Sequence, residues 1–229
     1  MHIKICGATH PSDVDLLAGL GIDLIGLWHG VPHGHADLSM DQLSGLAETA
    51  RVSAAAHPVL VTLLDDIDTI RRAVLESGVG WVQLHGYQHP ALVRAVKAAG
   101  PPGLTVVKVL HVQDGGCVER TLIKSYERAG VDFFLLDAMS EDGRIGSTAQ
   151  RLNCSVAADL VGRMSRPFFL AGGISAENRC DYEELTRHPR FFGIDVDTNA
   201  RGANGEFHPH RIEAIQQRWH TGAEQEMVA

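Results

Sequence analysis

Short runs of Val, Ile, Leu and Phe recur along the chain, and each is followed by a more polar, amphipathic segment. Runs of this composition are typical of strands that are buried on both faces of a sheet. The segments between them carry helix start and stop signals, for example Pro11, Ser39 and Gly78. This alternation predicts a parallel sheet whose strands are joined by helical crossovers.

The alternation predicts eight strands, each followed by a helix. The strands are expected at 3–7, 23–28, 58–63, 81–86, 105–110, 132–137, 167–173 and 192–196. The helices are expected at 11–20, 39–52, 66–76, 89–99, 117–129, 156–164, from 175 onward, and at 209–219.

Eight such units in one chain favour an α/β fold with a single (β/α)8 TIM barrel. An open, doubly wound sheet is the alternative, but no Gly-x-Gly-x-x-Gly turn follows the first strand. We expect the barrel to occupy residues 1–220 and a polar C-terminal tail to occupy 221–229.

Composition excludes several classes of protein. A chain of 229 residues with 45 % hydrophobic and 21 % charged residues suits one globular barrel. The net charge of −8 and the lack of a basic stripe argue against nucleic-acid binding. No apolar run reaches membrane-spanning length, and Lys4 and Asp13 interrupt the stretch where a signal peptide would be apolar. We therefore expect no membrane association and a cytoplasmic protein.

The first strand carries a cysteine at its end, in the stretch Ile3-Lys4-Ile5-Cys6-Gly7. In a parallel barrel, chemistry is placed at the C-terminal ends of the strands. Lys4 lies two residues before Cys6, so both side chains point to one face, and a nearby cation favours a thiolate. From the residues alone, a small buried hydrophobe is the favoured interpretation of Cys6. The four cysteines are far apart and predict no disulfide.

Five short motifs stand at predicted strand ends: Lys4-Ile5-Cys6-Gly7, Val82-Gln83-Leu84-His85-Gly86, Leu135-Leu136-Asp137, Leu170-Ala171-Gly172-Gly173-Ile174 with Asn178, and Gly193-Ile194-Asp195-Val196. In this order they resemble the phosphoribosylanthranilate isomerases of tryptophan biosynthesis, along nearly the whole chain. The resemblance implies an isomerase that performs an Amadori rearrangement of a phosphoribosyl amine.

The resemblance also implies roles for individual residues. It makes Cys6 the general base and Asp137 the general acid. Opening the ribose ring needs a proton delivered to the ring oxygen, and the next step needs a proton removed from C2′. The expected substrate contacts are Lys4, His29, His33, His35, Gln83, His85, Lys108 and Asp195. The expected phosphate contacts are Gly146, Gly172, Gly173, Thr198, Asn199 and Arg201.

Several of these residues have structural alternatives. Gln83 and His85 can be packing residues, and glycines make tight turns more often than phosphate sites. Lys108 is a poor core residue that faces either the barrel interior or an ion pair. We expect no cofactor, a phosphorylated sugar amine as the small-molecule partner, and a monomer or homodimer.

Three departures from the family leave the substrate open. The second-loop arginine that holds the anthranilate carboxylate in the family is absent, and His33 or His35 would be a poorer clamp. Asp197-Thr198-Asn199 replaces a Ser-Ser-Gly of the phosphate cradle, with Arg201 nearby to offset the carboxylate. Ala149-Gln150-Arg151 replaces a Phe-Asp-Trp.

An isomerase or lyase for another aldose-like substrate is therefore the alternative function. A non-catalytic ligand-binding barrel is disfavoured because Cys6 and Asp137 are both present.

The loop after the second strand contains His29, His33 and His35. Three imidazoles are a potential zinc site. Their spacing matches no known zinc signature, however, and glycines near His33 leave the loop too flexible to preorganise ligands. We expect no metal and assign these histidines as polar substrate contacts.

Overall fold

The computed structural model describes residues 1–53, 56–113, 115–139 and 151–224, and it is a closed barrel of eight parallel strands. The barrel strands are β1 (His2–Cys6), β2 (Leu24–Trp28), β3 (His57–Thr62), β4 (Trp81–Leu84), β5 (Thr105–Gln113), β7 (Phe133–Ala138), β8 (Phe168–Leu170) and β9 (Phe191–Val196). They pair in the order β4-β3-β2-β1-β9-β8-β7-β5, and a β4–β5 pairing closes the ring. The predicted (β/α)8 barrel is confirmed.

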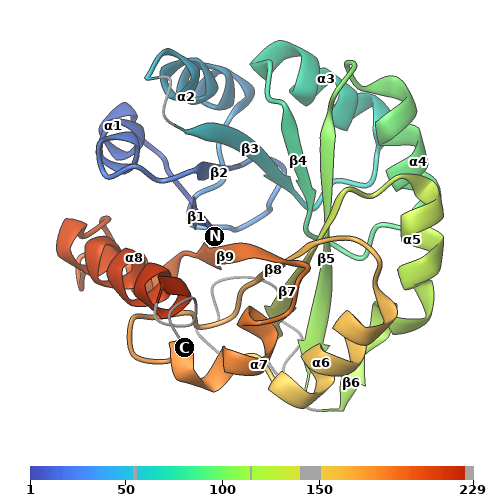
Figure 1. Cartoon of the computed structure of the whole chain (residues 1–229). Coiled ribbons are helices and arrows are strands. Elements are labelled where there is room, and N and C mark those ends of the chain that lie inside the picture. Colours follow the sequence, from blue (N-terminus) through green and yellow to red (C-terminus); the bar gives the residue numbers. More distant parts are fainter. Residues whose placement is uncertain (54–55, 114, 140–150, 225–229) are drawn as a thin grey trace.

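Helices surround the strands (Figure 1). They are α1 (Pro11–Gly19), α2 (Met40–Val52), α3 (Ile67–Ser77), α4 (Pro90–Ala99), α5 (Ile123–Ala129), α6 (Cys154–Arg163), α7 (Glu183–Thr186) and α8 (Pro209–Glu224). The side chains of Ser39, Asp66 and Asn153 cap α2, α3 and α6 by accepting backbone N–H groups of the first turn. Within the described residues, no helix combines the length and apolarity needed to cross a membrane.

The region after β5 differs from the sequence prediction. β5 forms a short antiparallel hairpin with β6 (Gly116–Cys117), followed by a 3-10 helix, η1 (Val118–Leu122), and only then by α5. Gly116, the first residue of β6, has a φ of 132°, a conformation that glycine adopts without strain. The predicted continuous helix at 117–129 is therefore wrong in its first half.

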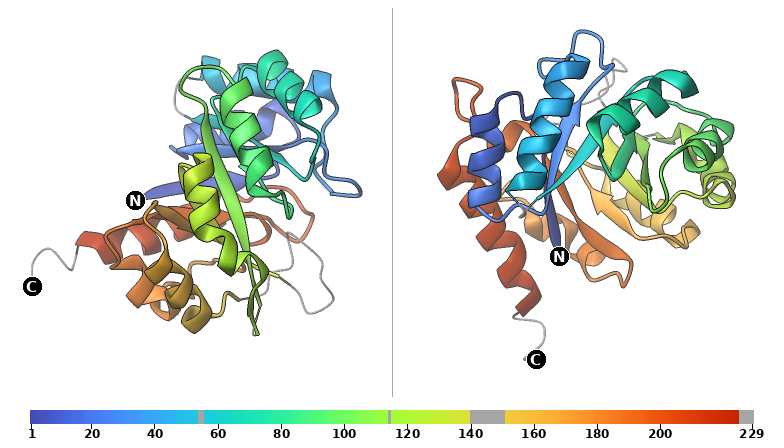
Figure 2. Two further views of the ribbon diagram at one scale, coloured as in Figure 1. Left: turned by 90° about the vertical axis from the view of Figure 1, so that its right-hand side faces the viewer. Right: turned by 90° about the horizontal axis from the view of Figure 1, so that it is seen from above.

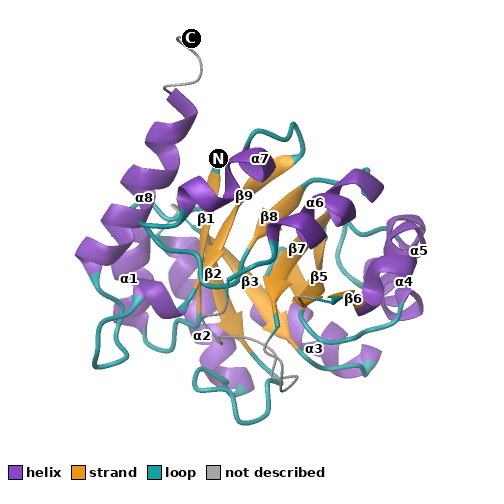
Figure 3. Cartoon of the chain, turned by 90° about the horizontal axis from the view of Figure 1, so that it is seen from below, coloured by secondary structure: helices purple, strands orange, loops and turns teal. Residues whose placement is uncertain are grey.

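Two other segments also differ from the prediction. The helix expected after Ser175 is a 3-10 helix, η2 (Arg179–Tyr182), followed by the single turn of α7. α8 continues to Glu224, past the expected end of the barrel at residue 220. Its C-terminal end extends away from the barrel (Figures 2 and 3).

Side chains alternate between two cores. The outer core lies between sheet and helices and includes Val106, Leu110 and Tyr126. The inner core fills the barrel and is built from Cys6, Leu24, Trp28, Ala36, Val59, Val61, Val107, Val109, Leu135, Phe169 and Ala171. Because successive strand residues face opposite sides, every second residue of a strand points inward, and the last inward residue stands at the mouth.

Candidate active site

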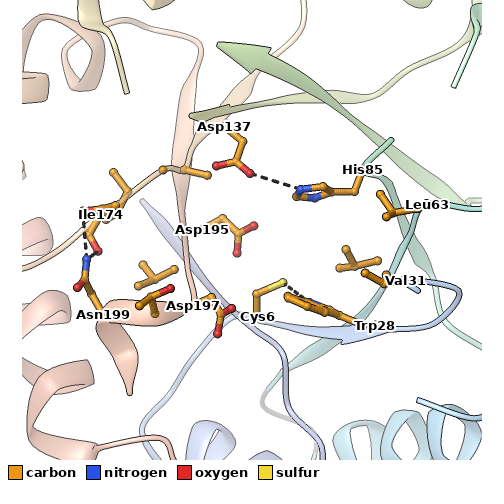
Figure 4. A pocket seen from close by; sticks show the side chains of 16 residues that line it. Cys6, Trp28, Val31, Leu63, His85, Asp137, Ile174, Asp195, Asp197 and Asn199 are labelled. Carbon is orange, nitrogen blue, oxygen red and sulfur yellow. Dashed lines mark hydrogen bonds and ion pairs between the residues drawn. The ribbon is translucent and has the colours of Figure 1, made fainter. Parts of the chain in front are cut away.

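One pocket opens at the C-terminal ends of the strands and has a volume of about 730 Å³, including its opening to solvent (Figure 4). Its walls are formed by Cys6, Trp28, Val31, Val61, Leu63, His85, Asp137, Ala171, Gly172, Gly173, Ile174, Asp195, Val196, Asp197, Thr198 and Asn199. These residues come from segments that are far apart in the sequence. The barrel thus brings eight of the sixteen predicted site residues to one place.

Cys6 stands at the floor of the pocket between two hydrogen-bond donors. Lys4 Nζ lies 3.2 Å from the sulfur, and Trp28 Nε1 lies 3.1 Å from it. Gly26 makes room, because a Cβ at that position would lie 2.5 Å from Cys6 Sγ. Burial raises the pKa of Cys6 to about 12, although Lys4 and Trp28 oppose the shift. Cys6 is therefore a thiol at neutral pH, with two donors placed to stabilise its thiolate.

Lys4 and Asp195 form an ion pair below the pocket. Their Nζ and Oδ2 atoms are 2.8 Å apart, and the side chains are only 3 % and 8 % exposed. Burial lowers the pKa of Lys4, but the charge of Asp195 and the contact with Cys6 outweigh it, so the pKa is raised and the amine stays protonated. Asp195 Oδ1 has no hydrogen-bond partner among the described residues. Asp195 lies between Cys6 and Asp137 in Figure 4, as a free acceptor for a donor on the substrate.

Asp137 faces His85 across the pocket, with 3.4 Å between Asp137 Oδ2 and His85 Nε2. The other ring nitrogen of His85, Nδ1, lies 2.8 Å from the side-chain Nε2 of Gln83. The amide donates to Nδ1, so neutral His85 carries its proton on Nε2, towards Asp137. Gln83 does not line the pocket and orients His85 from below.

The loop after β8 borders the pocket with two glycines. Gly172 and Gly173 have φ values of 82° and 61°, a left-handed conformation that glycine adopts without strain. The side chain of Asn199 donates to the carbonyls of Gly173 and Ile174 at 3.1 and 2.9 Å, and Asn178 also donates to the Gly173 carbonyl. Within the described residues, the N–H groups of 172–174 donate to no backbone carbonyl.

Arg201 forms an ion pair with Asp197, whose carboxylate borders the pocket. Its Nε donates to Asp197 Oδ1 at 2.7 Å, and its Nη2 donates to the carbonyls of Cys6 and Gly7. Arg201 is absent from the pocket wall and stacks over the ring of Phe207. It therefore stands behind Asp197 and ties the loop after β9 to the end of β1.

Six of the eight predicted substrate contacts do not line the pocket: Lys4 and Gln83, described above, and His29, His33, His35 and Lys108. His29 Nδ1 lies 2.8 Å from the Leu38 carbonyl, His33 is exposed, and exposed His35 packs its ring edge against Trp28. Lys108 points outward to α5, where its Nζ donates to the carbonyls of Gly86 and Val109 at 2.6 Å each. Gly146 lies outside the described residues. In the described part of the chain, no three His, Cys, Asp or Glu side chains gather as metal ligands.

Sequence reasoning missed the apolar wall and the indole that contacts Cys6. Trp28 is the last inward residue of β2, and Val31, Val61 and Leu63 line the wall beside it. The available signal was the position of Trp28 at a predicted strand end. The contribution of the loop residue Val31 had no local signal, because its position depends on how the whole loop folds.

The N-(5'phosphoribosyl)anthranilate (PRA) isomerase family model matches residues 3–200. N-(5'-phosphoribosyl)anthranilate isomerase 2 of Methanosarcina mazei is 32 % identical over 206 residues, which cover 90 % of this chain and 88 % of the relative. The isomerase of Cereibacter sphaeroides is 31 % identical over 218 residues, covering 95 % and 97 %. The crystal structure of the Thermus thermophilus isomerase superposes with a TM-score of 0.78 at 22 % identity, covering 96 % and 99 %.

Proposed function

The chain belongs to the N-(5′-phosphoribosyl)anthranilate isomerase family, and we propose that Cys6 and Asp137 isomerise a phosphoribosyl amine to the corresponding ketose amine. One observation carries the assignment of roles: a thiol from β1 and a carboxyl from β7 open onto one pocket, on either side of Asp195. The reaction is an isomerisation, so it needs only an acid and a base.

In the first step protonated Asp137 gives its proton to the ring oxygen of the ribose. The bond between C1′ and that oxygen breaks, and the nitrogen lone pair forms a C1′=N bond. His85 supports this step, because its Nε2–H lies 3.4 Å from the carboxylate that remains. A hydrogen bond from a neutral donor stabilises the ionised carboxylate after proton transfer.

In the second step Cys6, as a thiolate, removes the proton from C2′, and the electrons of that C–H bond neutralise the iminium nitrogen. The enol-amine that forms then takes a proton at C1′ and loses one from the C2′ hydroxyl, which gives the ketone. Lys4 and Trp28 stabilise the thiolate, since both place an N–H or ammonium group within 3.2 Å of the sulfur.

Binding is assigned to the two ends of the pocket. The N–H groups of 172–174 receive the phosphate, with Asn199 holding the loop in shape. Asp195 Oδ1 accepts from the amine nitrogen or a ribose hydroxyl. The aromatic amine lies against Trp28, Val31 and Leu63.

Proton NMR of the reaction mixture tests the proposed activity. Purified protein and N-(5′-phosphoribosyl)anthranilate should lose the C1′ methine signal and gain a C1′ methylene signal. In D2O the methylene should carry solvent deuterium, because its new proton comes through solvent. Conversion no faster than in buffer alone would refute the proposal.

We propose a second candidate, the same isomerisation with a different amine, on the strength of the apolar wall. Trp28, Val31, Val61 and Leu63 line that side of the pocket, and no Lys or Arg lines it among the described residues. Anthranilate brings a carboxylate to this side. A higher kcat/KM for the phosphoribosyl derivative of aniline than for that of anthranilate would favour the second candidate, and the reverse order would exclude it.

A further inference from the structure

A second buried ion pair lies next to the pocket and was not predicted from the sequence. His111, near the end of β5, and Glu119, in η1, place Nδ1 and Oε1 2.6 Å apart. Their side chains are 1 % and 2 % exposed. The backbone N–H of His111 also donates to Glu119, at 3.3 Å. In the barrel ladder His111 stands beside Asp137, its register partner on β7.

Both ring nitrogens of His111 face acceptors. Nδ1 faces the Glu119 carboxylate, and Nε2 lies 2.9 Å from the carbonyl oxygen of His85. An imidazole that donates from both nitrogens carries both protons and a positive charge. Burial would raise the pKa of Glu119, but the hydrogen bond and charge of His111 outweigh it and hold that pKa below its ordinary value. The pair is therefore an imidazolium and a carboxylate.

The pair acts at the point where the ladder between β4 and β5 ends. The last paired residues are Leu84 and Lys108. Beyond them, side chains of β5 replace backbone donors: His111 holds the carbonyl of His85, and Lys108 holds the carbonyl of Gly86. His85 is thereby fixed at its carbonyl by His111, in addition to its N–H bond to the Thr62 carbonyl and its ring contact with Gln83.

We propose that the His111–Glu119 pair is a positioning device that holds His85 with its Nε2–H directed at Asp137. The role rests on the proposed function, in which Asp137 is the acid that His85 supports. Glu119 keeps His111 doubly protonated, His111 fixes the His85 backbone, and the fixed backbone sets the direction of the imidazole. Neither His111 nor Glu119 lines the pocket, so neither contacts the substrate directly.

The test removes both partners of the pair together. Replacing both partners of a buried ion pair by apolar residues of similar size is often neutral for stability, so the variant carries His111→Leu together with Glu119→Met. Its kcat should fall at least about tenfold, because displaced catalytic groups lose rate steeply, while KM stays within about twofold, because neither residue contacts substrate. A folded double variant with unchanged kcat would overturn the proposal.

Glu119→Gln is the conservative variant. Its amide can donate to Nδ1 while Nε2–H still reaches the His85 carbonyl, so kcat should stay close to wild type. A loss as large as that of the double variant would contradict the proposal. The matched control is Arg120→Gln with Asp159→Asn, which removes an ion pair that is more than 40 % exposed on both sides and begins at the residue after Glu119. It should leave kcat unchanged.

A spectroscopic measurement separates this inference from the proposed function. The 15N shifts of the His85 ring should show a single Nε2–H tautomer in wild type and a mixture in the double variant. An identical His85 spectrum in both proteins would overturn the positioning role. A single tautomer in a wild-type protein that performs no isomerisation, with a mixture in the double variant, would refute the proposed function and leave the positioning role intact.

Discussion

Trp28 and Cys6 meet at the mouth of the barrel, where the indole Nε1–H donates a 3.1 Å hydrogen bond to the cysteine sulfur. The two residues come from the neighbouring strands β1 and β2, which pair Cys6 with Gly26. Trp28 is two residues further along β2, so its indole folds back over the sulfur. A thiol whose pKa burial raises to about 12 depends on such donors when it has to ionise.

Trp28→Phe tests this relationship. The variant keeps an aromatic ring and removes the N–H donor. A hydrogen bond to a charged group contributes about 1.5–3 kcal/mol, so kcat should fall by a factor of about ten or more with little change in the melting temperature. Steady-state rates and a thermal melt measure both. An unchanged kcat would show that the indole does not stabilise the thiolate.

Lys4→Met tests the buried pair beneath the pocket. The substitution leaves the buried Asp195 carboxylate without a counter-ion. Breaking a buried ion pair in this way costs about 3–5 kcal/mol in the free energy of unfolding. Adding Asp195→Asn should recover much of that loss without restoring activity. Urea denaturation gives the values.

The control for the buried pair is Lys97→Met, since Lys97 and Asp132 form a pair that is 29 % and 34 % exposed. It should cost no more than about 1–2 kcal/mol, because solvent screens a half-buried ion pair more than a buried one and one side-chain hydrogen bond is lost as well. Equal losses for the Lys4 and Lys97 variants would contradict the account.

Asn199→Ala tests the phosphate end. Without the Asn199 amide, the carbonyls of Gly173 and Ile174 lose their shared donor and the loop after β8 is no longer held in shape. The KM for a 5′-phosphorylated substrate should rise roughly tenfold, since about 1–3 kcal/mol follows the loss of a buried hydrogen bond. Turnover of the same substrate without its phosphate should be unaffected. Asn204→Ala, at an exposed site in the loop before α8, is the control; a phosphate-independent effect of Asn199→Ala would exclude the assignment.

Lys108 predicts a pH dependence of stability. Burial lowers its pKa from 10.5 to about 8. Between these pH values the unfolded chain binds more protons than the folded chain, so the contribution of Lys108 to the free energy of unfolding rises as pH rises. The stability of wild type relative to Lys108→Met should therefore increase by roughly 2–3 kcal/mol from pH 7 to pH 10. Urea denaturation of both proteins at pH 7 and pH 10 measures this difference in the free energy of unfolding. A difference that is the same at both pH values would rule out a lowered pKa of Lys108.

The alternation of apolar and amphipathic segments was sufficient to predict the barrel, since each unit is recognisable locally. The hairpin after β5 was not predictable in this way, because a helix pattern from Cys117 onward competes with the turn at Gly116. The positions of the strand ends were also predictable from the sequence. Cys6, His85, Asp137 and Asp195 were predicted at strand ends, and all four line one pocket.

Which way a side chain points was harder to predict. β5 is apolar on both faces, so its sequence does not reveal that Val107 and Val109 face inward and Lys108 outward. The predicted substrate contacts His29, His33 and His35 lie outside the pocket wall for a different reason. The Leu38 carbonyl holds His29, and the chain returns to pair Trp28 with Asp37, which leaves His33 exposed. These contacts depend on the folded loop and have no local signature.

The most direct test of the acid–base assignment is the rate at which wild type, Cys6→Ala and Asp137→Asn isomerise N-(5′-phosphoribosyl)anthranilate. Cys154→Ala is the matched control, because Cys154 lies at the start of α6 and does not line the pocket. The account predicts that each of the two site variants loses a factor of at least about 10² in kcat while its melting temperature barely moves, and that the control keeps its rate. A near-normal rate in either Cys6→Ala or Asp137→Asn would contradict it.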